Sequence, residues 1–127
     1  MFMKRHLQRR KAMECMYQHL LLKKNIKEIL LDNGVTGLSA EEIFVTEIVQ
    51  DANLNKNVYI SEINDKLSDW EFVRLGFIEQ SILLVALSEF HLGHVERAII
   101  INEAIELAKE FGDEDAYKLI NGVLDQL

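Results

Sequence analysis

Proline is absent from this sequence of 127 residues, and glycine occurs only six times. Collagen-like repeats and turn-rich β-sandwiches need many of both residues, so neither class fits. Hydrophobic residues make up 49% of the chain, which excludes a disordered protein. The composition therefore predicts a compact, all-helical domain with a sizeable core.

Cysteine and long apolar runs are scarce as well. The single cysteine, Cys15, cannot form an internal disulfide, and the sequence does not open on a signal-peptide pattern. The longest purely apolar run covers residues 82–87, whereas a membrane-spanning helix needs about 20 residues. We expect a cytoplasmic protein with no membrane partner.

The patterns that would indicate catalysis or metal binding are missing too. His91 and His94 have a two-ligand spacing, but zinc needs three or four ligands and no further cluster supplies them. The acids Glu103, Glu106 and Glu110 recur at helical steps, as on a solvated helix face. The sequence has no Gly-rich phosphate loop and no nucleophile elbow. We expect no metal, no cofactor and no enzymatic activity.

Charge is distributed unevenly along the chain. The net charge is −7, but residues 1–27 hold eight Lys or Arg and only one acid, Glu14. The remainder is strongly acidic. A basic end on an acidic body can bind a polyanion locally while the body repels it elsewhere. The search for a nucleic-acid site therefore narrows to the first helix.

The basic segment leads into a helical pattern that starts at about Arg9. At 3.6 residues per turn, His6, Arg10 and Tyr17 lie on one flank of this helix. Exposed cations beside an aromatic ring can bind phosphates and stack a base of single-stranded RNA. The alternative is a solvated basic helix start in which Tyr17 only covers the core, and the pattern itself leaves both interpretations open.

The middle of the chain predicts several further helices. Ser39 and Glu42 have the spacing of a capping box, and so do Ser68 and Glu71. A polar break at residues 53–57 indicates a seam between two halves. An apolar helix over residues 73–90 should be buried on several sides and should end near Gly93.

The pattern at residues 99–125 predicts two amphipathic helices joined at Gly112. Gly112 is predicted to adopt a left-handed conformation that closes the first helix. Acidic residues at 113–115 favour the start of the second helix. The second helix continues through Gly122, which we expect to allow close approach of another backbone. With the segments before them, these make about seven helices.

The last segment, INEAIELAKEFGDEDAYKLINGVLD, closely resembles the C-terminal signature of the NusB family of bacterial transcription antitermination factors. RRKAMECMYQ, near the N-terminus, resembles the Arg-rich N-terminal pattern of the same family. The resemblance implies an all-α fold of two packed helical subdomains. Residues 1–127 would then form a single RNA-binding domain with its subdomain seam near residues 53–57.

The resemblance also implies functional residues. On the first helix it assigns RNA contact to Arg5, Arg9, Arg10 and Tyr17, with Lys4 and Lys11 as further candidates. We expect these basic side chains to be exposed. On the last helix it assigns Asp115 and Lys118 to the RNA-binding surface, and on the central helix it assigns Glu79 to contact with a protein partner.

The function implied is binding of boxA-type single-stranded RNA together with NusE, a small-subunit ribosomal protein. With other Nus factors, the complex would couple the RNA to elongating RNA polymerase, chiefly in ribosomal RNA operons.

The acidic body and the departures from the family pattern at residues 84 and 119 favour an alternative. Leu84 stands where an Arg is common, Leu119 where an aromatic residue is common, and Gln80 where a basic residue is common. The alternative is a protein–protein adaptor of the same fold, as a monomer or a homodimer, with a weakened or lost RNA site.

Overall fold

The computed structural model describes residues 4–127 as seven α-helices and one short 3₁₀-helix, with no strand among these residues. The helices are α1 Arg5–Leu22, α2 Ile26–Asp32, α3 Ala40–Leu54, α4 Lys56–Lys66, η1 Phe72–Arg74, α5 Phe77–Leu92, α6 Arg97–Phe111 and α7 Ala116–Leu124. The predicted all-α class with seven helices is confirmed.

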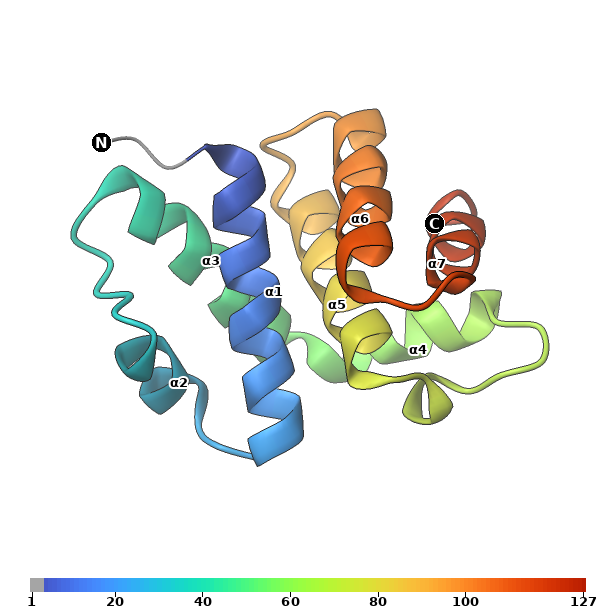
Figure 1. Cartoon of the computed structure of the whole chain (residues 1–127), viewed down its shortest axis with the longest axis horizontal. Coiled ribbons are helices and arrows are strands. Elements are labelled where there is room, and N and C mark those ends of the chain that lie inside the picture. The colour runs from blue at the N-terminus through green and yellow to red at the C-terminus, as the bar shows by residue number, and fades with distance from the viewer. Residues whose placement is uncertain (1–3) are drawn as a thin grey trace.

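Helix α5 is the centre of the molecule. It packs against α1 and α3 on one side and against α4, α6 and α7 on the other (Figure 1). All ten residues from Gln80 to Glu89 are buried, as expected for a helix that is apolar nearly all round. The helix starts at Phe77 rather than near residue 73, because residues 72–74 form η1 instead. Gly93 ends it in the predicted left-handed conformation, with φ +71°.

A partly buried polar network joins α3, α4 and α5. Asp51 Oδ2 accepts hydrogen bonds from the Tyr59 hydroxyl at 2.6 Å and from the Ser88 hydroxyl at 2.8 Å. Burial, together with the bond to Asp51, raises the pKa of Tyr59. The break between α3 and α4 falls at Asn55. The division into two subdomains stays a prediction, because α5 packs against helices on both sides of that break.

Two capping boxes were predicted, and one forms. Ser39 Oγ accepts from the Glu42 backbone N–H at 3.2 Å and donates to the Glu42 carboxylate at 2.8 Å. The prediction of a capping box at Ser68 and Glu71 is wrong, since the backbone at Glu71 is extended and leads only into the three residues of η1.

Gly112 is needed for a reason other than the predicted one, and Gly122 lacks the close neighbour that was predicted. Gly112 has φ −89° and ψ 178°, so it is not left-handed. A Cβ there would lie 2.6 Å from Ala116 Cβ and 2.8 Å from the Ala108 carbonyl oxygen. Gly112 therefore permits a close turn between α6 and α7. Gly122 lies inside α7 as predicted, but a Cβ there would meet no heavy atom within 4 Å.

Helix α1 is longer than predicted, since it starts at Arg5 rather than near Arg9. Lys4 is the N-cap residue, and its side chain makes no capping hydrogen bond. The extra turn places the basic residues on a regular helix, so their directions follow from helical geometry. Among the described helices, none has the length and hydropathy of a membrane span.

Candidate nucleic-acid interface

The first turn of α1 is exposed. Lys4 and Arg5 both face solvent, and the Arg5 guanidinium lies 3.9 Å from the centre of the Phe44 ring. Arg5 also donates a hydrogen bond of 2.6 Å to the Gln8 side chain. A cation held on an aromatic face is ordered but keeps donors free for a ligand. Arg5 can thus contact a phosphate.

Arg9 lies one turn further along and is buried rather than exposed. Its Nε donates to Glu89 Oε2 at 2.7 Å and its Nη2 to Glu89 Oε1 at 3.0 Å. The side chains are 5% and 4% exposed. The expectation that Arg9 is a surface charge is wrong, because Arg9 lies one turn before the buried Met13 and therefore shares the face of α1 that packs against α5. RNA contact by Arg9 stays a prediction, and it would require this ion pair to open.

Arg10 is half-exposed at the seam between α1 and α6. Its Nη1 lies 2.9 Å from Glu110 and its Nε 3.2 Å from Glu14. The guanidinium also lies 4.9 Å from the centre of the Phe111 ring. His6 continues the seam, with Nδ1 2.7 Å from Glu103 Oε2. The acids of α6 thus neutralise part of the basic face of α1.

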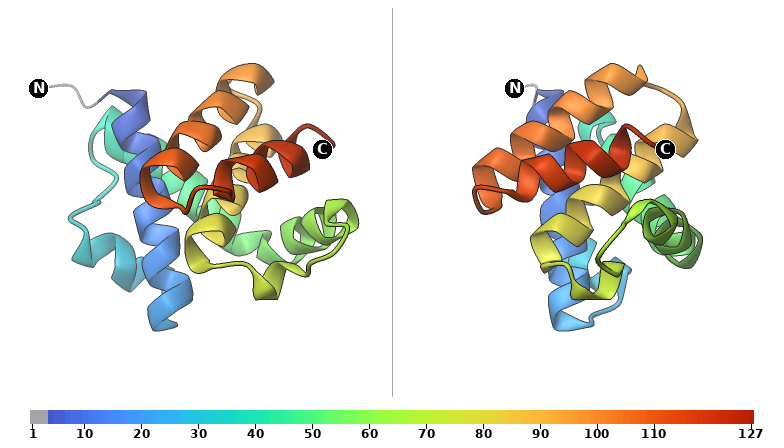
Figure 2. Two further views of the ribbon diagram at one scale, coloured as in Figure 1. Left: turned by 45° about the vertical axis from the view of Figure 1, so that its right-hand side comes forward. Right: turned by 90° about the vertical axis from the view of Figure 1, so that its right-hand side faces the viewer.

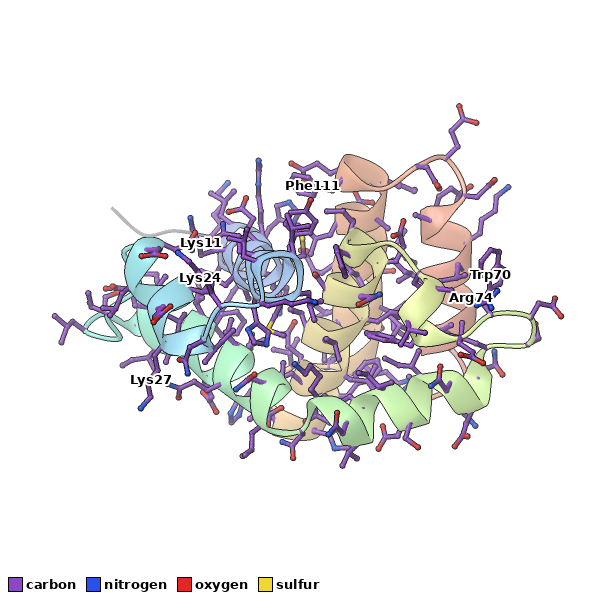
Figure 3. All side chains as sticks on the ribbon, turned by 90° about the horizontal axis from the view of Figure 1, so that it is seen from below. Lys11, Lys24, Lys27, Trp70, Arg74 and Phe111 are labelled. Atoms are coloured by element: carbon purple, nitrogen blue, oxygen red, sulfur yellow. The ribbon has the colours of Figure 1, made fainter. Side chains whose placement is uncertain are left out.

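Lys11 and Tyr17 lie further along α1. Lys11 Nζ lies 3.6 Å from Glu14, and both side chains are about one-third exposed. Tyr17 is half-buried. In the view of Figure 3, Lys11, Lys24 and Lys27 lie on the α2 side of α1, whereas Phe111 lies on the α6 side. Helix α1 therefore presents cations in two directions, and both Arg10 on the α6 side and Lys11 on the α2 side have carboxylate partners.

Glu79 and Asp115 come together at a second location. They line a shallow hollow of about 370 Å³ between the start of α5 and the start of α7. Trp70, Arg74 and Leu119 line the same hollow. Trp70 is 55% exposed, and Figure 3 shows it beside Arg74 at the far side of the molecule from Lys11. Asp115 is the N-cap residue of α7 and makes no side-chain capping bond.

Lys118 accompanies Asp115 on the surface of α7. Its Nζ lies 3.6 Å from Asp115 Oδ1, and both side chains are more than half exposed. Ion pairs this exposed contribute at most about 1 kcal/mol. Both residues are therefore available to a ligand.

Sequence reasoning missed the aromatic partners of the α1 cations, Phe44 and Phe111. The Phe111 ring is half-buried and lies under Arg10. Sequence reasoning also missed Trp70 and Arg74, which line the hollow beside Glu79. No local spacing signals such contacts, because each joins elements that are distant in the sequence.

The departures from the family pattern lie in different environments. Leu84 is fully buried, so this position faces the core. Gln80 is also buried, and its Nε2 donates to the Leu75 carbonyl at 2.9 Å, which fixes the start of α5. Only Leu119 faces a surface feature, since it lines the hollow with Trp70.

Histidine and cysteine side chains have other roles. His91 stacks on Tyr59, and His94 Nε2 lies 3.0 Å from Glu47. Within residues 4–127, no group of three or more His, Cys, Asp or Glu could hold a metal ion. Burial raises the pKa of the Cys15 thiol to about 11, so this side chain stays protonated at neutral pH.

Comparison with known proteins identifies relatives along nearly the whole chain. The family model described as "NusB family" matches residues 6–127. The transcription antitermination protein NusB of Bacillus cereus is 33% identical over 126 residues, covering 98% of this chain and 97% of the relative. The protein of the same name from Bacillus thuringiensis is 32% identical, with the same coverage of both chains.

Solved structures agree on the fold. NusB from T. maritima superimposes with a TM-score of 0.90 at 23% identity, covering 99% of this chain and 91% of that one. A chain in the crystal structure of antitermination factors NusB and NusE in complex with dsRNA gives a TM-score of 0.81 at 25% identity. The match covers 98% of this chain and 96% of that one. The helical arrangement described above is thus shared over its full extent.

Proposed function

The chain belongs to the NusB family of transcription antitermination proteins, and we propose from this premise that it binds boxA-type single-stranded RNA together with NusE. The match to curated antitermination proteins over 98% of the chain carries the proposal. The function is binding, with no bond made or broken. It belongs in the bacterial cytoplasm, where transcription takes place.

The RNA site we propose follows α1. Lys4, Arg5 and Arg10 supply exposed or half-exposed cations, and Tyr17 supplies an aromatic face. Phosphates account for most of the affinity of such sites, and stacked bases add to it. A phosphate approaching Arg10 would replace the carboxylates of Glu14 and Glu110. The half-exposed ion pairs with these acids would then give way to a half-exposed ion pair with the phosphate.

Lys11, Asp115 and Lys118 complete the RNA contacts that we propose. Lys11 and Lys118 would neutralise phosphates, and Asp115 would accept from a base N–H. Arg9 belongs to this set only if RNA opens its pair with Glu89.

NusE is the protein partner that we propose, and Glu79 would contact it. A solved complex of NusB and NusE with dsRNA supports this pairing for a relative. Three acids, Glu79 on α5 and Asp113 and Asp115 just before α7, line the hollow with one cation, Arg74, and this excess of negative charge suits a partner segment carrying positive charge. Through NusE and other Nus factors, the bound RNA would be tethered to elongating RNA polymerase, chiefly in ribosomal RNA operons.

A protein–protein adaptor, monomeric or homodimeric, is the second candidate. The observation that favours it is the pairing of Arg9 and Arg10 with Glu89 and Glu110, which removes two cations from the free basic surface. Under this alternative the protein would still capture NusE, but it would not bind RNA.

The RNA site is tested by replacing Arg10 with Gln and measuring RNA affinity at several salt concentrations. Loss of one phosphate contact should weaken binding and lower the slope of log K against log salt by about 0.7. Lys27→Gln, on the exposed surface of α2, removes the same charge as a matched control and should change neither quantity. Equal effects of the two substitutions would contradict a site at Arg10.

A further inference from the structure

The corner between α6 and α7 carries an aromatic ring flanked by two lysines. Lys109 Nζ lies 5.2 Å from the centre of the Tyr117 ring, and Lys118 Nζ lies 6.0 Å from it. Lys109 is in the last turn of α6 and Tyr117 in the first turn of α7. The close turn at Gly112 brings them together, and Figure 2 shows α7 packed alongside α6 after this turn.

The surface beside the ring is hollowed. A shallow depression of about 340 Å³ is lined by Lys109, Gly112, Asp113, Glu114 and Tyr117. It therefore combines a π face, an ammonium group and two carboxylates within one short segment. This hollow is distinct from the one that contains Trp70, which has only Asp113 in common with it.

We infer that this corner is a nucleotide-binding subsite for single-stranded RNA, in which a base stacks on Tyr117 and the adjoining phosphate is neutralised by Lys109 and Lys118. The inference rests on the proposed function and adds Tyr117 and Lys109 to the RNA contacts already proposed at Asp115 and Lys118. Because the lysine ammonium groups lie over the ring, a stacking base displaces one of them, and the displaced ammonium group can then neutralise the phosphate that follows the base.

The two carboxylates decide which ligand fits. Asp113 and Glu114 repel a bare phosphate or an acidic peptide that enters the hollow. They can accept hydrogen bonds from the exocyclic amino group of cytosine or adenine. The base therefore enters the hollow with its amino edge toward the acids, while its phosphate stays at the rim beside the lysines.

The subsite also bears on the aliphatic residue at position 119. Leu119 lines the hollow with Trp70, whereas Tyr117 lines the hollow with Lys109, so the two residues face different sides of α7. The ring that this helix offers to a base is therefore at position 117.

Substitutions at Tyr117 test the stacking. Tyr117→Leu should weaken binding of a fluorescein-labelled boxA-type RNA by about 5-fold to about 150-fold, whereas Tyr117→Phe keeps the ring and should bind as the parent protein does. Lys109→Gln should lower the salt slope by about 0.7, and the control Lys27→Gln should not. Thermal unfolding of each variant verifies its fold.

Fluorine NMR separates this subsite from the α1 site. The chain has three tyrosines, so 3-fluorotyrosine labelling gives one resonance each for Tyr17, Tyr59 and Tyr117. RNA should shift the signals of Tyr17 and Tyr117, while buried Tyr59 serves as an internal control. A shift at Tyr17 alone, with Tyr117→Leu binding normally, would overturn the subsite and leave the proposed function standing. Absence of any RNA binding would overturn both.

Discussion

Arg9 and Glu89 form a bidentate ion pair between α1 and α5, with both side chains about one-twentieth exposed. Removing one partner of such a pair leaves an uncompensated charge in the core. Arg9→Ala should therefore lower the free energy of unfolding by about 3–5 kcal/mol. Urea denaturation measures this value directly.

Arg10→Ala is the matched control for that experiment. Arg10 is 39% exposed, so its ion pairs are screened by water and its loss should cost at most about 1 kcal/mol. Combining Arg9→Met with Glu89→Leu should recover much of the lost stability, because it removes both charges together. A small loss for Arg9→Ala alone would contradict the buried pair.

Two glycine-to-alanine substitutions should change the stability of the fold in opposite directions. At Gly112 the added Cβ would lie 2.6 Å from Ala116 Cβ, so Gly112→Ala should destabilise the fold by about 1–3 kcal/mol. At Gly122 the space is open and the backbone is helical, so Gly122→Ala should stabilise it by about 0.5–1 kcal/mol. Thermal unfolding of the two variants measures both changes in stability. Equal changes would show that the turn at Gly112 is not close.

Glu42 predicts a specific acid dependence of stability. The Thr36 backbone N–H, followed by the hydroxyls of Thr36 and Ser39, lowers the pKa of this carboxyl from about 4.5 to about 2. A pKa lowered by folding stabilises the protein above the unfolded value, and this contribution is lost as pH falls from about 4.5 toward about 2. Glu42→Gln should therefore flatten the dependence of Tm on pH in this window.

Glu41→Gln is the control, since Glu41 lies in the same helical turn and its substitution removes an equal charge. If both substitutions flatten the pH profile equally, the effect comes from overall charge rather than from the hydrogen bonds that Thr36 and Ser39 donate to Glu42.

Glu110 restrains the basic face of α1. Its carboxylate lies 2.9 Å from Arg10 Nη1 and 3.7 Å from His6 Nε2. Glu110→Gln should free Arg10 for phosphate, tighten RNA binding and steepen its salt dependence by about 0.7. Glu106→Gln, on the exposed face of the same helix, removes an equal charge and should produce a smaller gain. Equal gains would show that only net charge matters.

Local patterns in the sequence predicted the fold well. Ser39 with Glu42, the apolar run through Leu84 and the end at Gly93 each depend on neighbours within one or two turns. Such patterns report helix starts, burial and helix ends directly. The family signature at residues 101–125 added the arrangement of the helices.

The candidate site was less predictable, because its environment is set by contacts between distant segments. Arg9 and Arg10 are adjacent in the sequence, yet one is buried against Glu89 and the other faces Glu110. The spacing of Arg9 from Met13 places Arg9 on the buried face of α1. The acids that the two arginines meet come from α5 and α6, and no local pattern signals them. The hollow beside Tyr117 likewise depends on the turn at Gly112, whose conformation the sequence suggested incorrectly.

The most direct test of the account is fluorescence anisotropy of a labelled boxA-type RNA titrated with this protein, with and without NusE. The account predicts saturable RNA binding that weakens with salt and tightens when NusE is added. Folded protein that captures NusE but leaves the RNA free in both titrations would contradict it, and would favour the protein–protein adaptor.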